Sequence, residues 1–122
     1  MRRFTLLLFA TLVTHTALAA DEGLNGQWVV DLSAKPGKPY TQPMQLSLLA
    51  DGRVEGSFYN STIEGGRWKE DRGRICASFR TSDDVGPYHT SVCLTGATAT
   101  GQTWAEQRNF LFNWNAARPS GK

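Results

Sequence analysis

Short runs of alternating apolar and polar residues make up the chain after residue 20, and a turn signal follows each run. No stretch of eleven residues there places its apolar positions at helical spacing. Instead, a β-rich run followed by a turn recurs about every 8–12 residues, a spacing typical of β-sandwiches and β-barrels. We therefore expect eight strands, at residues 26–33, 43–49, 53–59, 62–69, 74–80, 88–95, 97–104 and 108–115.

The side chains of the second and third expected strands indicate how the two strands pair. With residues 50–52 as a three-residue loop, Met44 faces Phe58 and Leu48 faces Val54. One face of this hairpin is then apolar and the other is polar. A slip of one residue would reverse every side chain, so the pattern favours this register.

The two cysteines fall opposite one another in the hairpin that turns between Asp84 and Val85. This register pairs Cys76 with Cys93 on the polar face. Side chains directly opposite in an antiparallel pair are close to disulfide range. We expect a Cys76–Cys93 disulfide, with two free thiols as the alternative.

Two further features of the pattern concern local geometry. Ile63 and Trp68 lie on the same expected strand with opposite parity, and a β-bulge at Gly65–Gly66 would return both to one face. A last turn at Glu106-Gln107 would place small residues opposite aromatic ones, with Gly101 facing Phe112 and Ala99 facing Trp114.

Consecutive hairpins favour an all-β, eight-stranded antiparallel up-and-down barrel. Closure removes the exposed strand edges that a chain of this size would otherwise present. The interior of an eight-stranded barrel is either filled by side chains or holds one small ligand.

The sequence resembles the calycins, the superfamily of lipocalins, avidins and fatty-acid-binding proteins. The resemblance lies in the G-x-W motif at Gly26–Trp28, and residues 26–32 and 56–59 are similar to the first and third strands of avidins. Val29 and Val30 stand where avidins place an Asn of their biotin site, so biotin binding is not implied. The resemblance implies a calycin-like barrel in which Trp28 closes one end and packs against Arg118 after the last strand.

The first twenty residues have the pattern of a secretory signal peptide. Arg2 and Arg3 precede an apolar run over residues 4–13, and Ala17-Leu18-Ala19 is an A-x-A cleavage signal. We expect residues 1–20 to be removed, leaving residues 21–122 as a single barrel domain, periplasmic or secreted. An oxidising compartment fits the expected disulfide.

Removal of this leader changes the charge of the protein. The full chain has 13 Lys and Arg and 11 Asp and Glu, and the leader contains two of the arginines. The remaining domain is neutral, which argues against a nucleic-acid partner because such proteins need a basic surplus. No second long apolar run follows the leader, so we expect no membrane span.

Catalytic chemistry has few candidate residues in this sequence. His15 belongs to the leader, which leaves His89, with Ser91 and two nearby aspartates, as the one imaginable relay. Nothing indicates the strained nucleophile turn and oxyanion hole that such a relay needs. A metal site needs several converging ligands. We expect no enzymatic activity, no metal site and no cofactor.

Aromatic, polar and glycine residues gather at two places that we expect to be loops at a barrel end. The segment 57–68 offers Tyr59, Asn60 and Glu64, with Arg67 pointing inward or outward depending on the bulge. Tyr88 and His89, next to Gly86-Pro87, form the second candidate. The alternative at both places is ordinary turn geometry and a solvated surface.

Two functions remain open on this evidence. The first is a secreted binding protein that holds a small hydrophobic or amphipathic ligand at the barrel mouth. The second is a protein-interaction barrel with a filled core, such as a hydrolase or protease inhibitor. Trp104 near the last turn is a candidate contact for a partner protein. The expected partner is an unidentified small molecule or protein.

Overall fold

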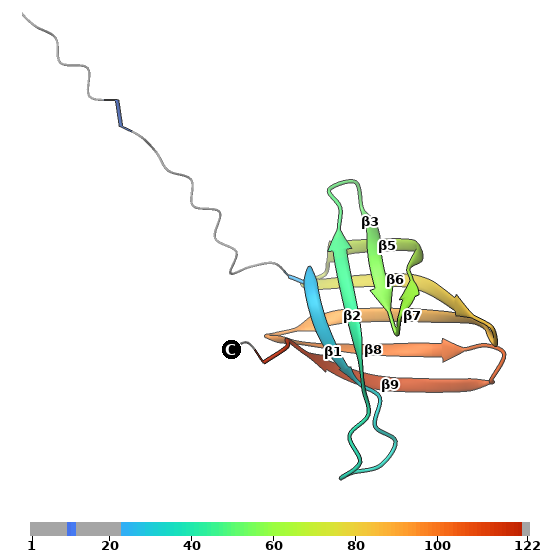
Figure 1. Ribbon diagram of the computed structural model, residues 1–122. Coiled ribbons are helices and arrows are strands. Elements are labelled where there is room, and N and C mark those ends of the chain that lie inside the picture. Colours follow the sequence, from blue (N-terminus) through green and yellow to red (C-terminus); the bar gives the residue numbers. More distant parts are fainter. Residues whose placement is uncertain (1–9, 12–22, 121–122) are drawn as a thin grey trace, which may run out of the picture.

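Antiparallel strands follow one another through the chain in the computed structural model, which describes residues 10–11 and 23–120 (Figure 1). The strands are β1 (Gly26–Asp31), β2 (Thr41–Leu48), β3 (Arg53–Phe58), β4 (Ser61–Thr62), β5 (Glu64–Asp71), β6 (Arg74–Asp83), β7 (Gly86–Thr95), β8 (Thr98–Ala105) and β9 (Phe110–Ala117). The described residues contain no helix, and so none long and apolar enough to cross a membrane. Apart from residues 10–11, the expected signal peptide lies outside the described residues.

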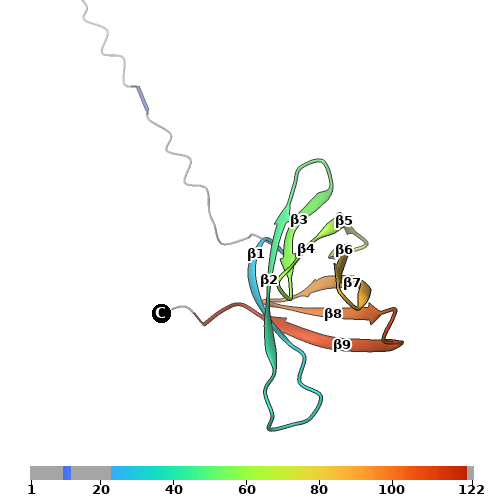
Figure 2. The same ribbon diagram turned by 45° about the vertical axis from the view of Figure 1, so that its right-hand side comes forward.

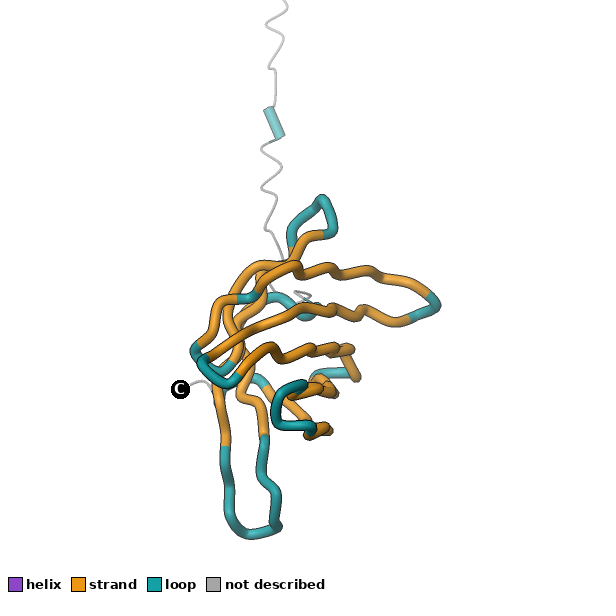
Figure 3. The backbone as a smooth tube through the Cα atoms, turned by 90° about the vertical axis from the view of Figure 1, so that its right-hand side faces the viewer, coloured by secondary structure: helices purple, strands orange, loops and turns teal. Residues whose placement is uncertain are grey.

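The sheet closes on itself. Successive strands pair with one another, except that β4 and β5 both pair with β3. Strand β1 also pairs with β9, with Val29 opposite Ala117 and Asp31 opposite Asn115. Strands β4 and β5 are two parts of the single strand expected at residues 62–69. The predicted fold, an all-β, eight-stranded antiparallel up-and-down barrel, is confirmed. Figure 3 shows the strands wrapping around a common interior, with the loops gathered at their ends.

The predicted registers of two hairpins are confirmed. Met44 lies opposite Phe58 in β2–β3, and Cys76 lies opposite Cys93 in β6–β7. The two cysteines form a disulfide on the outer face of the barrel. Their sequence separation is 17, and closing a loop of this size stabilises the fold by about 3 kcal/mol on the chain-entropy model.

The expected bulge also occurs, in β5 where it pairs with β6. Glu64 pairs with Arg80 and Arg67 with Ser78, so that Gly65 and Gly66 together stand opposite one residue of β6. Gly65 has φ +63°, a conformation that favours glycine. The bulge leaves Ile63 buried and Trp68 packed against the core.

The predicted register of the last hairpin is wrong by two residues. Gly101 faces Trp114 rather than Phe112, because the β8–β9 loop contains four residues, 106–109, rather than two. Asn109 takes φ +52° and donates its N–H to the Glu106 carbonyl at 3.1 Å. Asn tolerates this left-handed conformation, which makes the longer turn possible. A shift of two residues leaves each side chain on the face predicted for it.

One end of the barrel is sealed by Trp28. Its indole N–H donates to the Leu24 carbonyl at 2.9 Å, and both residues are fully buried. The Arg118 guanidinium lies on the ring, 3.8 Å from its centroid. The contact that the calycin resemblance implied is therefore present.

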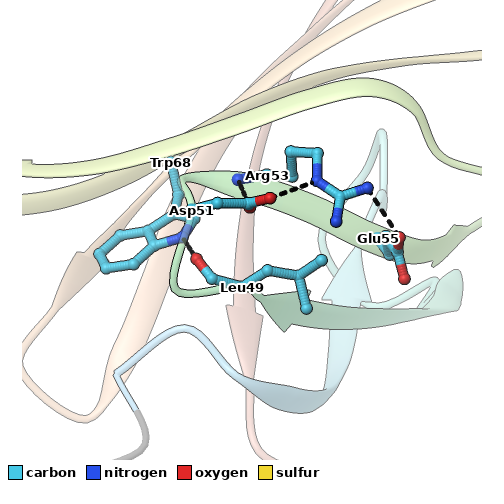
Figure 4. A network of polar contacts seen from close by, with 5 residues as sticks. All are labelled: Leu49, Asp51, Arg53, Glu55 and Trp68. Atoms are coloured by element: carbon cyan, nitrogen blue, oxygen red, sulfur yellow. Dashed lines mark hydrogen bonds and ion pairs between the residues drawn. The ribbon is translucent and has the colours of Figure 1, made fainter.

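Trp68 closes the β2–β3 hairpin at the same sealed end. Its indole N–H donates to the Leu49 carbonyl at 2.7 Å, as Figure 4 shows. The same picture shows Arg53 on the exterior of the hairpin, paired with Asp51 at 2.7 Å and Glu55 at 3.6 Å. Because these charges are exposed, they contribute little to stability. The indole of Trp68 packs against the core at this end of the barrel.

Candidate functional site: the pocket at the barrel mouth

The opposite end of the barrel contains a pocket of about 320 Å³. It lies where β1, β3, β6 and β8 end and where β2, β7 and β9 begin. The long β1–β2 connection extends from this end of the sheet (Figure 2). The pocket is lined by Leu32, Tyr40, Phe58, Tyr59, Ser61, Thr81, Asp83, Tyr88, Thr103, Arg108 and Phe112.

Two tyrosines form one wall of the pocket. The rings of Tyr40 and Tyr59 meet edge to face with centroids 6.2 Å apart, and their hydroxyls are hydrogen-bonded to each other. The Tyr40 hydroxyl also accepts a hydrogen bond from Gln42 Nε2 at 3.3 Å. The contact between Tyr40 and Tyr59 joins the β1–β2 loop to the β3–β4 turn across the mouth.

Both tyrosines are fixed through their backbones. The Leu32 N–H donates to the Tyr40 carbonyl at 2.8 Å, and the Tyr40 N–H donates to Ser33 Oγ at 2.9 Å, which closes the base of the β1–β2 loop. Tyr59 and Asn60 form the two-residue β3–β4 turn with φ of +53° and +63°. Positive φ at both central residues is the type I′ arrangement of hairpins. A bulky side chain such as Tyr59 is rare there and is held at a cost in backbone energy.

Asp83 and Tyr88 form the opposite wall, at the ends of β6 and β7. The Tyr88 hydroxyl donates to Asp83 Oδ2 at 2.8 Å, and the Val85 and Gly86 N–H groups donate to Oδ1 at 2.8 and 3.3 Å. Desolvation acts to raise the pKa of Asp83. These hydrogen bonds and the positive charge of Arg108 outweigh it and hold the pKa below the usual 3.8. Asp83 is therefore ionised at neutral pH.

The pKa of Tyr88 is shifted in the opposite direction, upward. Desolvation, and then the hydrogen bond to Asp83, raise its pKa above the usual 10.0, although Arg108 acts to lower it. The phenol therefore remains protonated at neutral pH and stays a donor to the carboxylate. Arg108 reaches this wall from the β8–β9 loop.

The floor of the pocket is aromatic with a short buried polar chain. Phe58 packs against Trp114 with ring centroids 5.5 Å apart. The Trp114 indole N–H donates to Thr103 Oγ1 at 3.0 Å, and this hydroxyl is hydrogen-bonded to Thr90 Oγ1 at 2.9 Å. The indole N–H of Trp114 and the hydroxyls of Thr103 and Thr90 are all hydrogen-bonded in this row, so the floor is rigid.

The structure brings only two of the six predicted binding residues to this pocket, Tyr59 and Tyr88. Asn60 is exposed in the same turn as Tyr59, outside the lining. Glu64 lies on the surface, 3.4 Å from Arg80, and Arg67 points outward. His89 is exposed, 4.0 Å from Glu106.

Several lining residues were not predicted from the sequence. Tyr40 lies at the end of a segment interpreted only as a connection. Arg108 was assigned to a strand because the last turn was expected two residues too short. Asp83 lies between the strands expected at residues 74–80 and 88–95. An Asp in a turn commonly accepts a hydrogen bond from the backbone N–H two residues later, as Asp83 does from Val85. Among residues 23–120, no three His, Cys, Asp or Glu side chains lie close enough to hold a metal ion.

No family model, no curated protein and no solved structure matches the chain.

Proposed function

We propose that the protein binds a small hydrophobic or amphipathic ligand in the mouth pocket, in the periplasm or outside the cell. The observation that carries the proposal is a pocket of about 320 Å³ walled by aromatic rings at the open end of a closed barrel. Small-molecule sites are concave, mostly apolar, and contain a few polar groups that orient the ligand. A volume at the lower end of their range suits a ligand of one or two rings.

The pocket is prepared for binding before the ligand arrives. Tyr40 and Tyr59 hold each other across the mouth, and Tyr88 is fixed by Asp83. A ligand that meets groups already in place loses less free energy to the ordering of side chains. This rigidity supports a binding role for the site.

We propose binding rather than catalysis. A general base needs a pKa near the working pH and a free lone pair aimed at the substrate. The lowered pKa of Asp83 makes it a weak base, and both of its oxygens already accept hydrogen bonds. His89 faces away from the pocket.

The exported location is supported by the Cys76–Cys93 disulfide. Disulfides form and persist in oxidising compartments such as the periplasm and the extracellular medium, and they are rare in the reducing cytosol.

Native mass spectrometry of the protein purified from its own host tests the proposal. We expect the wild type to retain a small molecule. Ser61→Trp, which fills the mouth, should lose it, whereas Ser78→Trp, a matched change on the outer face, should keep it. A wild-type protein without any adduct, or an adduct that Ser61→Trp retains in full, would contradict the proposal.

A second candidate function is protein interaction. Phe110 and Leu111, beside the β8–β9 loop, are 53% and 48% exposed, and Val85 at the tip of the β6–β7 hairpin is exposed as well. Exposed apolar side chains at neighbouring loop tips are typical of contact surfaces. Loss of a copurifying protein on Leu111→Ser, with small-molecule binding unchanged, would favour this function.

A further inference from the structure

The mouth pocket contains one side chain of each charge, and the two are not equally available to a ligand. Asp83 and Arg108 are the charged residues of the lining. A carboxylate offers about four lone-pair positions. Three donors already use those of Asp83, namely two backbone N–H groups and the Tyr88 hydroxyl. The carboxylate is thus largely saturated by the protein itself.

The guanidinium of Arg108, in contrast to the Asp83 carboxylate, is not saturated by hydrogen bonds within the protein. It carries five N–H donors in a planar fork, of which one is directed to the Tyr88 hydroxyl. It belongs to none of the ion pairs formed among residues 23–120, so most of its donors have no protein partner. Asp83 lies beyond ion-pair distance and influences Arg108 only through space. The charged group with unused bonding capacity at the mouth is therefore a cation.

Aromatic rings make up much of the rest of the pocket lining, from Phe58, Phe112, Tyr40, Tyr59 and Tyr88. The Phe58 ring is buried, whereas Tyr40 and Tyr59 are each 45% exposed. An apolar ring of the ligand would pack against these faces, while a polar group at its end would reach Arg108 at the edge.

We infer that the ligand is a small amphipathic acid, an apolar ring that bears a single carboxylate and binds with that carboxylate on Arg108. The inference rests on the proposed function. The planar guanidinium matches a carboxylate with two parallel hydrogen bonds. The Asp83 carboxylate lies on the same wall as Arg108 and repels negative charge. A ligand with one negative charge therefore meets less repulsion than a ligand with two.

Three probes of one shape test the inference by isothermal titration calorimetry at neutral pH. They are hydrocinnamate, its neutral amide, and phenylpropylamine, which carry a negative charge, no charge and a positive charge. We expect hydrocinnamate to bind about tenfold more tightly than the amide, the range of a hydrogen-bonded charge pair at a partly solvated site. The amine should bind most weakly.

Two arginine variants separate the role of Arg108 from a general effect of charge. Arg108→Gln should abolish the tenfold preference, so that hydrocinnamate and the amide bind with similar affinities. A thermal unfolding midpoint close to that of the wild type shows that this variant is folded. Arg67→Gln removes the same charge from the outer face and should keep the tenfold preference.

The outcomes distinguish this inference from the function on which it rests. Equal binding of acid and amide by the wild type, or tightest binding of the amine, would overturn the acid and leave the pocket as a binding site. A preference for the acid that persists in Arg108→Gln would overturn the role of Arg108. If none of the three probes binds, both the inference and the mouth pocket as a small-molecule site are wrong.

Discussion

The guanidinium of Arg118 stacks on the indole of Trp28 and at the same time donates hydrogen bonds to three backbone carbonyls near the start of the domain. The acceptors are Gly23 at 2.8 Å, Asn25 at 2.6 Å and Gln27 at 3.2 Å. One side chain beyond the last strand therefore fixes both the segment that leads into Trp28 and the indole ring that seals the barrel. The beginning and the end of the fold meet in this cluster.

A double-mutant cycle should show that Trp28 and Arg118 stabilise the fold together. Trp28→Ala should cost about 3–5 kcal/mol because it removes a fully buried aromatic ring. Arg118→Ala should cost about 1–2 kcal/mol, from the ring contact and from carbonyls that must return to water. Denaturant unfolding of both single variants and the double variant measures the coupling. Because the residues touch, the losses should not add; additive losses would show that the contact contributes nothing.

Position 101, beneath the Trp114 ring, has room for glycine but not for a residue with a side chain. A Cβ at this position would lie 2.3 Å from two carbon atoms of the indole ring. Gly101→Ala should therefore lower the unfolding free energy by about 1–3 kcal/mol, the usual cost of overpacking a core.

The matched test is Gly101→Ala in a Trp114→Phe background. The smaller ring leaves room for the methyl group, so the second substitution should cost much less there than in the wild type. Equal costs in the two backgrounds would show that the indole does not set the limit.

Tyr59 should be strained in the β3–β4 turn, and two substitutions isolate that strain. Tyr59→Asn and Tyr59→Ala both remove the phenol, but Asn tolerates the left-handed conformation at φ +53° better than Ala does. The Asn variant should be more stable than the Ala variant by about 1 kcal/mol. Both should lose ligand affinity equally, because both lack the ring. Equal stability of the two variants in thermal unfolding would contradict the strain.

The hydrogen-bonded carboxylate of Asp83 should make stability depend on pH in the acid range. Its pKa in the folded protein is below the usual 3.8, so its stabilising effect is present at higher pH and is lost as pH falls through the folded value. Asp83→Asn should be less stable than the wild type above about pH 5, with the difference shrinking below about pH 4. Unfolding measured across this range checks the trend. A difference that stays constant would assign the effect to shape rather than to charge.

The fold was best predicted from the sequence in hairpins where the residues on one or both faces are compatible with a single register. Apolar pairs such as Met44 with Phe58 left one acceptable register, and the opposed cysteines did the same for the β6–β7 hairpin. Turn length was less well specified. A shift of two residues keeps every side chain on its face, so the alternating pattern of β9 could not reveal that Gly101 lies opposite Trp114.

The pocket was only partly predictable for the same reason. Tyr59 and Tyr88 stand at strand ends that the pattern marks, and both line the mouth. Arg108 reaches the mouth only because the β8–β9 loop has four residues, and Tyr40 only because the β1–β2 loop closes on Leu32. Such positions depend on backbone hydrogen bonds of loops, which alternation of residue types does not encode.

Three indole N–H groups provide the most direct measurement of where a ligand binds. The N–H of Trp114 donates to Thr103 in the pocket floor, whereas those of Trp28 and Trp68 donate to backbone carbonyls at the sealed end. Their signals should be followed in the proton–nitrogen correlation spectrum during titration with hydrocinnamate. Binding at the mouth predicts a saturable shift of the Trp114 signal while the Trp28 and Trp68 signals stay in place. A stationary Trp114 signal up to the solubility limit of the probe, or equal shifts of all three signals, would contradict a ligand site at the barrel mouth.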